Sequence, residues 1–303
     1  MNKEIYKVTD KENTLRLDKV LTIFNKKNSR VYYSNLIKNG EVLVNGNKVS
    51  PSYKVRENDE ISINYVEKED EKDLKPLELA LDVVYEDNDV LVINKPKGLV
   101  VHPGGGHYDD TLVNALIYNE KELSNINGLN RVGIVHRIDK DTSGLLLICK
   151  NNFAHKEIAS QLETHSMHRE YIALVDGIIT SDSGKIIGKI GRSKENRLKM
   201  AIDNINGKEA ITHFEVLKRY KKYTLIKCRL ETGRTHQIRV HMSSINHPLV
   251  GDKIYGGSTS LYNEGQLLHA YNLTFIQPST KKEVNVQIDL PQYFIDVLNK
   301  LEN

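Results

Sequence analysis

The sequence predicts an α+β protein in two unequal parts, a small helix-and-hairpin module followed by a larger strand-rich domain. Three observations lead to this prediction. Helical spacing followed by a hairpin pattern occupies residues 12–66, a charged stretch ending at Pro76 occupies residues 67–76, and strand-like apolar runs begin soon after residue 77. We place the second domain at residues 77–300, because a chain of 303 residues is long enough for two cores.

Composition excludes several broad classes of protein. With 39% hydrophobic and 27% charged residues the chain is neither fibrous nor disordered, and no apolar run is long enough to cross a membrane. The first residues lack the apolar stretch of a secretory signal. Cys149 and Cys228 are too few for a disulfide framework or a cysteine zinc site. We therefore expect a soluble, cytoplasmic protein with no membrane partner.

The formal net charge of +3 hides an uneven distribution along the chain. Residues 11–65 carry ten Lys and Arg against six Asp and Glu, a net charge of +4. Residues 67–73 carry five acidic residues and two lysines, without an apolar period. This pattern predicts a basic module and a solvated linker.

The elements of the module follow from local signals. Apolar residues recur at helical spacing over 17–24, and Ser29 can cap a second helix that ends near Gly40. Asn45-Gly46 lies between two strand-like runs, which is a strong hairpin signal. The alternating segment 59–66 then completes the module as a strand.

Basic residues crowd these two helices, among them Arg16, Lys19, Arg30 and Lys38. The order RLDKVL, SRVYYSNLIKNGEVLVNGNKV and NDEI resembles the small RNA-binding module first described in the fourth small-subunit ribosomal protein. Such modules contact structured RNA mostly through its phosphates. The resemblance implies that these four residues contact RNA.

The segment 131–150 holds the most reactive-looking group of side chains. We expect its apolar residues, at Val132, Ile134 and 145–148, to form two strands that flank a polar turn over 136–143. A turn between buried strands presents polar groups on a rigid support. Asp139 in this turn could act alone as a nucleophile at a sugar or base carbon if a basic residue orients it.

Other chemistries fit these residues less well. Asp139 and Asp141 are too close in sequence for the spaced carboxylate pair of a glycosidase. Ser143 and His136 lack the GxSxG context of a hydrolase, and the glycines at 104–106 lack the spacing of a nucleotide-binding loop. His236, His241 and His247 match no common pattern of metal ligands, so we expect no metal.

Two further segments contribute candidate residues. Tyr171 begins a strand that Asp176-Gly177 ends, and residues 218–239 carry eight Lys and Arg against one Glu. Arg239 sits between Ile238 and Val240, so we expect it to be buried. A buried guanidinium is costly unless an anion pairs with it, which suggests that Arg239 meets Asp139.

Five segments in order resemble the RluA-type pseudouridine synthases: HRIDKDTSGLLLICK, REYIALVDG, GRTHQIRVHM, HPLVGDKIYGG and QLLHAYNLTF. Together with the module, the resemblance covers residues 14–65 and about 80–298. It is strongest to the members that act on large-subunit ribosomal RNA. It implies a mixed, largely antiparallel central sheet crossed by a cleft.

The resemblance also implies roles for individual residues. Asp139 would be the essential catalytic residue, Tyr171 would lie against the target base, and Arg239 would pair with Asp139. Arg137 would fill the gap left by the extruded nucleotide, and Arg234 would help bind RNA.

The implied reaction isomerises uridine in RNA to pseudouridine and needs no small-molecule cofactor. Ribosomal RNA is the favoured substrate, with transfer RNA as the alternative. Attack of Asp139 on the sugar and loss of uracil through a glycal are both open. A non-catalytic RNA-binding or assembly factor with this fold would lack the aspartate, tyrosine or arginine, and all three are present.

Overall fold

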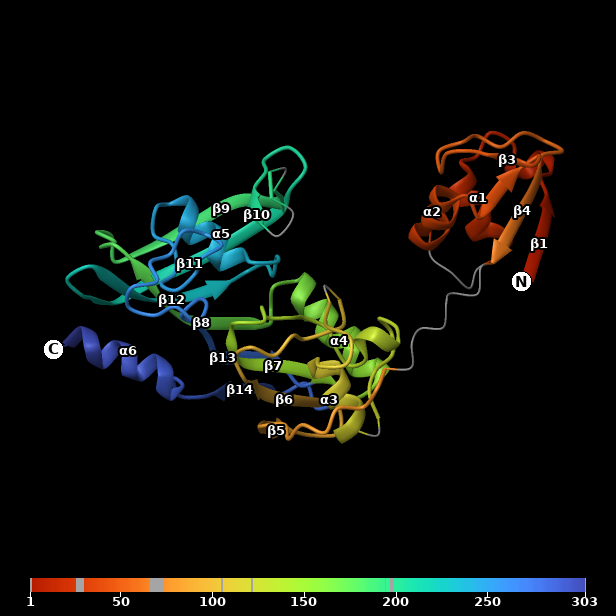
Figure 1. Ribbon diagram of the computed structural model, residues 1–303. Helices are drawn as coiled ribbons and strands as arrows, with labels where there is room; N and C mark the ends of the chain where they lie inside the picture. The colour runs from red at the N-terminus through yellow and green to blue at the C-terminus, as the bar shows by residue number, and fades with distance from the viewer. Residues whose placement is uncertain are drawn as a thin grey trace. The chain divides into compact units, whose positions relative to one another are not determined.

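The computed structural model describes residues 2–25, 30–65, 74–104, 106–120, 122–193, 195–196 and 199–302. The chain divides into two compact units, Met1–Asp73 and Leu74–Asn303 (Figure 1). The charged linker predicted at 67–76 falls mainly on residues 66–73, which lie outside the described residues. No helix in the described part of the chain is both long and apolar enough to cross a membrane.

The first unit is a four-stranded sheet with two helices. Its elements are β1 (Asn2–Lys7), α1 (Leu17–Phe24), α2 (Arg30–Asn39), β2 (Val42–Val44), β3 (Asn47–Lys48) and β4 (Glu60–Tyr65), and the strand order is β1-β4-β2-β3. The predicted hairpin is confirmed: Val44 pairs with Asn47, and Asn45 and Gly46 have φ of 50° and 78°. The edge strand β1 was not predicted, and the proposed cap Ser29 lies outside the described residues.

Helices and sheet of this unit enclose one apolar core. Leu17, Val20 and Leu21 of α1 are fully buried and pack with Tyr33 of α2 and Ile63 of β4. The helical spacing of the first three residues therefore marks the face that is removed from water.

The second unit is built on a ten-stranded sheet. Its elements are β5 (Val83–Glu86), β6 (Val90–Lys95), α3 (Leu112–Asn119), β7 (Ser143–Cys149), α4 (Asn152–Glu163), β8 (His168–Asp176), β9 (Ser183–Arg192), β10 (Met200–Ile202), β11 (Lys208–Arg219), β12 (Tyr223–Leu230), α5 (Gln237–Ser244), β13 (Leu268–Ile276), β14 (Glu283–Gln287) and α6 (Gln292–Glu302). The strand order is β10-β9-β11-β12-β8-β13-β7-β6-β5, and β14 pairs with β13. Strand β13 runs parallel to β7, whereas the other named strand pairs described are antiparallel, which confirms the mixed, largely antiparallel sheet.

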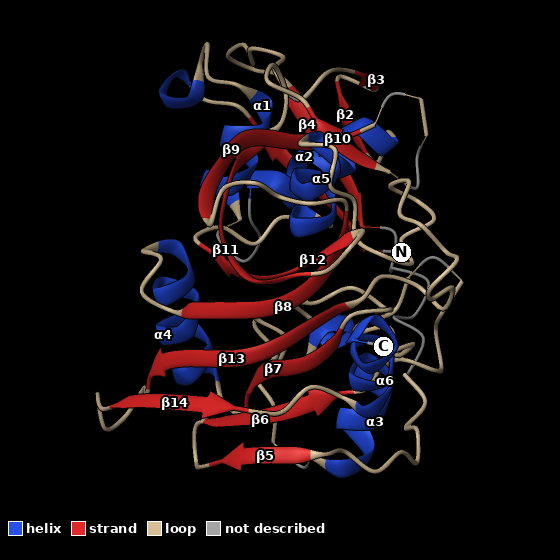
Figure 2. Ribbon diagram, turned by 90° about the vertical axis from the view of Figure 1, so that its left-hand side faces the viewer, coloured by secondary structure: helices blue, strands red, loops and turns tan. Residues whose placement is uncertain are grey.

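Strands β6 and β7 are buried on both faces, which explains their continuous apolar sequence. Val92 and Leu147 face α4, while Ile93 and Leu146 face α3. In the other half of the unit, β9, β11 and β12 curl around α5 (Figure 2). Ile238 and Met242 of α5 join the core formed by β8, β11 and β12.

The predicted strand at Val132 and Ile134 is wrong. This segment is irregular and touches β7 through a single bridge between Ile134 and Ile148. Gly133 has a φ of 69°, which an extended strand does not allow, and its N–H donates to the Ser124 carbonyl at 2.6 Å. The polar turn therefore has a regular strand on only one side, β7.

Gly144 lets β7 approach β13, and this contact generates the first prediction. A Cβ at Gly144 would lie 2.2 Å from the Ala270 carbonyl oxygen, and its φ is 110°. The Gly144→Ala variant should lose about 3 kcal/mol of unfolding free energy, or fail to fold, because two backbones must separate.

Gly98→Ala is the matched control, because Gly98 has a φ of 86° but no atom within 4 Å of an added Cβ. It should cost only about 1 kcal/mol from backbone strain. Urea unfolding of both variants measures the difference, and equal losses would show that the approach of β13 has no role.

Candidate active site

Asp139 lies in the polar turn that leads into β7, at the edge of a hollow between the two halves of the sheet. Its side chain is 16% exposed, and Oδ2 accepts a hydrogen bond from Arg239 Nη1 at 3.2 Å. Oδ1 is 4.0 Å from Nε2 of His236. The hollow is also lined by Arg137, Tyr171 and Arg239. The sequence therefore brings together residues that are up to 100 positions apart.

A buried lysine, Lys95, binds the backbone of this turn. Lys95 ends β6 with 0% exposure, and its Nζ donates to the carbonyls of Pro96, Leu99 and Lys140 at 2.7, 2.9 and 3.1 Å. Burial lowers the pKa of Lys95 to about 7, and the charges of Asp141 and Asp139 partly oppose this shift. Three carbonyl acceptors match the three donors of an ammonium group, so this site holds the backbone of the turn at Lys140 in place.

Arg239 is the buried cation of the site, and it binds two carboxylates. It lies in the first turn of α5 and is 4% exposed. Nε and Nη2 donate to the carboxylate of Asp252 at 2.6 and 2.9 Å, while Nη1 reaches Asp139. Burial by itself lowers the pKa of Arg239, but the hydrogen bonds that it donates to Asp252 and the charge of Asp139 outweigh burial, and the pKa is raised. The guanidinium is therefore a permanent positive charge beside Asp139.

The start of α5 is fixed by the buried amide of Gln237. Its Nε2 donates to the Ile211 carbonyl and to Thr212, and its Oε1 accepts from Thr232 and from the Arg234 N–H. These bonds hold the segment 232–237 against β11. Arg239, two residues further on, is positioned by the same anchor.

His236 precedes α5 in a left-handed conformation with a φ of 57°. Its Nδ1 is 2.8 Å from the Tyr255 hydroxyl, which accepts the Met200 N–H at 2.9 Å. The tyrosine proton is thus available to Nδ1, leaving an Nε2–H directed toward Asp139. Burial lowers the pKa of His236, although Asp139 partly opposes the shift. Because a neutral imidazole carries no charge, Arg239 is the group that balances the negative charge of Asp139.

Tyr171 lies in β8, as predicted, and forms part of the wall of the hollow. It is buried and packs in the core shared by β8, β12 and α5. Burial raises the pKa of its hydroxyl, Arg169 lowers it, and Asp139 raises it further. The phenol therefore stays neutral and offers an aromatic surface near the carboxylate.

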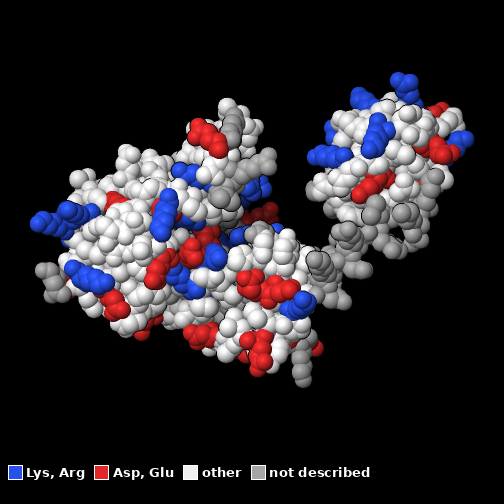
Figure 3. Space-filling model, in the orientation of Figure 1, with Lys and Arg blue, Asp and Glu red and all other residues white. Residues whose placement is uncertain are grey.

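The residues predicted to bind RNA lie in two places. Arg137 and Arg234 line the hollow, where Arg137 Nη1 contacts His102 and Arg234 Nε donates to the Glu209 carbonyl. In the module, Arg16 and Arg30 both bind the carboxylate of Asp18, at 2.9 and 3.1 Å. Lys19 and Lys38 are exposed, and Figure 3 shows Lys and Arg at the surface of both units.

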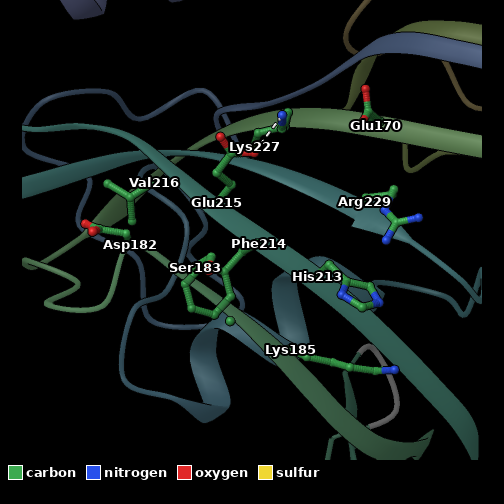
Figure 4. Close-up of a pocket in the computed structure, with 11 residues that line it drawn as sticks. Glu170, Asp182, Ser183, Lys185, His213, Phe214, Glu215, Val216, Lys227 and Arg229 are labelled. Carbon is green, nitrogen blue, oxygen red and sulfur yellow. Dashed lines mark ion pairs between the residues drawn. The ribbon is translucent and has the colours of Figure 1, made fainter.

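A larger hollow of about 790 Å³ lies over β8, β9, β11 and β12 (Figure 4). Glu170 lines it, and because side chains alternate along a strand, Glu170 points away from the face that carries Tyr171. Besides Arg239, three basic residues of the segment 218–239 are paired with carboxylates, namely Lys218 with Glu302, Arg219 with Asp182, and Lys227 with Glu215. This hollow holds no part of the Asp139 arrangement.

Other chemistries weighed from the sequence find little support. Ser143 contacts His269 at 2.8 Å and Tyr293 at 2.7 Å, and the Nε2 of His136 accepts the Leu147 N–H instead. No three His, Cys, Asp or Glu side chains among the described residues are grouped as metal ligands would be.

Sequence reasoning missed Asp252 and Lys95, which hold the site together. Asp252 lies in the segment HPLVGDKIYGG directly before Lys253, so its sequence context does not mark it as buried. Lys95 ends an apolar strand directly before a proline. A charged residue at the end of an apolar strand needs a buried partner, and that requirement could have identified Lys95.

Two family models match the chain. Residues 89–244 match the model of the RNA pseudouridylate synthases, and residues 15–61 match that of the S4 domain. The first match contains Asp139, Tyr171 and Arg239, and the second contains both helices of the module.

Similar proteins extend over nearly the whole chain. An uncharacterised RNA pseudouridine synthase of Bacillus subtilis is 44% identical over 99% of both chains. The ribosomal large subunit pseudouridine synthase D of Zymomonas mobilis is 44% identical over 91% of this chain and 90% of its own. Among solved structures, human RNA pseudouridylate synthase domain containing 1 has 29% identity and a TM-score of 0.56, covering 70% of this chain and 84% of its own.

The bidentate contact between Arg239 and Asp252 generates the second prediction. Asp252→Asn keeps the shape of the side chain but removes the charge opposite a buried guanidinium. We expect a loss of about 3 kcal/mol of unfolding free energy, measured by urea unfolding.

Asp182→Asn is the control, because Asp182 also binds an arginine, at 2.7 Å from Arg219, but its side chain is 91% exposed. It should cost less than about 1 kcal/mol. If the two substitutions cost the same, the buried pair is not what holds Arg239.

Proposed function

The chain belongs to the RNA pseudouridylate synthase family, and on this premise we propose that its substrate is uridine in large-subunit ribosomal RNA, with Asp139 as the nucleophile. The enzyme is an isomerase that converts uridine in RNA to pseudouridine. The assignment of residues rests on one observation, the carboxylate of Asp139 held at 3.2 Å from Arg239 in a hollow walled by Tyr171.

The proposed reaction moves the uracil ring from one bond to the ribose to another. The bond between uracil N1 and the sugar C1′ breaks, the ring turns in the pocket, and a bond from C5 to C1′ forms. N1 gains a proton and C5 loses one, so the conversion involves no net oxidation or reduction. We therefore infer that no small-molecule cofactor is required.

Asp139 is suited to attack because one oxygen is held and the other is left free. Oδ2 takes the Arg239 bond, and among the described residues Oδ1 accepts no hydrogen bond. Asp252 accepts from Nε and Nη2 and so holds Arg239 with Nη1 toward Asp139, where it stabilises one carboxylate oxygen and leaves the other uncovered. A poorly solvated carboxylate is more nucleophilic than a fully hydrated one. We propose that Oδ1 attacks C1′ and expels uracil N1, and that C5 of the turned uracil then attacks C1′ and releases the Asp139 carboxylate.

Tyr171 is proposed to lie against the uracil. A base inside a folded RNA must leave its stack to reach Asp139, at a cost of a few kcal/mol. An aromatic wall beside the carboxylate would regain part of that cost by stacking. Arg137, which borders the same hollow, is proposed to fill the space that the nucleotide leaves.

Ribosomal RNA is favoured over transfer RNA by two findings. The N-terminal unit matches the S4 domain, which adds a second RNA-binding surface suited to a large structured substrate. Relatives at 41–44% identity are named ribosomal large subunit pseudouridine synthase D. A ribosomal substrate would place the enzyme in the cytoplasm, a reduced compartment that fits its two buried free cysteines.

The nucleophile assignment predicts the behaviour of Asp139→Asn. Pseudouridine formation on a large-subunit ribosomal RNA transcript should fall by at least about 10³-fold, because the amide cannot attack. RNA affinity should stay within about threefold, since it depends mainly on phosphate contacts. Asp141→Asn, two residues further along the same turn, should keep activity within about tenfold. Equal losses in both variants would contradict the assignment.

The proposed substrate predicts which RNA loses its modification in cells without this enzyme. Pseudouridines should disappear from large-subunit ribosomal RNA and persist in transfer RNA. Chemical mapping of both RNAs measures this, and restoring the intact gene but not the Asp139→Asn form should return the modification. Loss confined to transfer RNA would contradict the ribosomal proposal.

A further inference from the structure

Arg169 is a second buried arginine beside the catalytic hollow, and unlike Arg239 it has no carboxylate. It is the second residue of β8 and is 6% exposed. Its Nη2 donates a long hydrogen bond of 3.5 Å to the Glu231 carbonyl, and its Nε has no partner among the described residues. Because a buried unpaired guanidinium is expensive, the fold carries a cation that the protein alone does not satisfy.

Gly233 makes the room for this cation. A Cβ at position 233 would lie 2.6 Å from Nη1 of Arg169, so any side chain there would displace the guanidinium. The backbone at Gly233 has no positive φ that would by itself require glycine. The close approach of Arg169 therefore explains why position 233 is a glycine. At this contact the REY segment of β8 meets the GRTHQ segment.

The surroundings of Arg169 are strongly basic. It lines both the hollow of Asp139 and an adjoining hollow of about 570 Å³. Arg131, Arg137 and Arg234 line the second hollow, against two carboxylates, Glu163 and Glu209. Arg137 and Arg234 contact a histidine and a backbone carbonyl, and no described carboxylate lies within ion-pair distance of either. Several guanidinium groups without carboxylates form a good site for a phosphate, which they can bind through paired N–H donors.

The position of this group relative to Tyr171 indicates which phosphate it would take. Arg169 and Tyr171 are two residues apart on one strand and line the same hollow, so their Cα atoms are about 7 Å apart. At this spacing the Arg169 guanidinium can reach the sugar–phosphate backbone of a nucleotide whose base lies against Tyr171. We propose that Arg169, with Arg234, binds the RNA phosphodiester next to the flipped uridine. This inference rests on the proposed function, because it takes RNA as the substrate.

Arg169→Met tests the proposal, because it removes the charge and keeps an apolar side chain of similar length. RNA affinity is measured in the Asp139→Asn background with a large-subunit ribosomal RNA transcript over a series of salt concentrations. We expect affinity to fall by about 10- to 100-fold and the slope of log K against log salt to shrink by about 0.7 to 0.9, the value of one phosphate contact. The melting temperature of the free protein should not fall, because the variant removes an unsatisfied buried charge.

Arg229→Gln is the matched control. Arg229 is an exposed arginine of the neighbouring strand β12, at the hollow of Figure 4 and away from Asp139. Its substitution should leave the salt slope and the affinity unchanged. An unchanged affinity and slope in Arg169→Met would overturn the proposal and leave Arg169 with a packing role only.

Arg169→Lys keeps the test decisive if the methionine variant fails to fold. A lysine retains the charge but cannot donate two parallel hydrogen bonds, so the salt slope should persist while affinity drops about tenfold. Affinity equal to that of the parent would overturn the proposal. Failure of the wild-type enzyme to modify the transcript would instead overturn the ribosomal substrate, so the two failures are distinguishable.

Discussion

The contact of Arg239 with Asp252 and Asp139 is the interaction on which the site depends. Asp252 accepts from Nε and Nη2 of the guanidinium while Nη1 donates to Asp139, so the bidentate pair with Asp252 fixes the direction of the Nη1 contact. Without Asp252, a buried arginine facing one carboxylate could rotate and cover both of its oxygens. The position of the Asp139 carboxylate is therefore set by a residue that does not border the hollow.

The two buried arginines show how the same residue type can serve structure and binding. Arg239 is neutralised inside the protein, and its removal would leave two carboxylates facing each other. Arg169 is accommodated by Gly233 but left without a carboxylate, so the free protein carries an unfavourable charge that a phosphate would satisfy. Binding sites for polyanions commonly carry such unsatisfied positive charge, at some cost to stability.

Much of the Asp139 site could be predicted from the sequence, because a polar residue within an apolar stretch is unusual and is easily recognised. The apolar strand after the turn pointed to Asp139, and the apolar neighbours of Arg239 required an anionic partner. Asp252 could not be assigned in the same way, since its position depends on a turn in which a Cβ at Gly257 would lie 1.8 Å from the Leu249 carbonyl.

The strand expected at Val132 was wrong because a single positive-φ glycine, Gly133, interrupts an otherwise suitable pattern. Strand β1 has a weak pattern of its own and is formed by pairing with β4.

The contacts within the N-terminal module show how its basic residues are held. Arg16 and Arg30 share the carboxylate of Asp18, whose side chain is only 6% exposed. Hydrogen bonds from Arg16 lower the pKa of Asp18, burial opposes this shift, and Arg30 adds to the lowering, so the carboxylate stays ionised at neutral pH. Two arginines on one carboxylate leave a net positive charge with fixed orientation, whereas Lys19 and Lys38 are exposed at the surface. A phosphate would therefore meet pre-positioned guanidinium groups first, and the lysines would add charge without fixing its place.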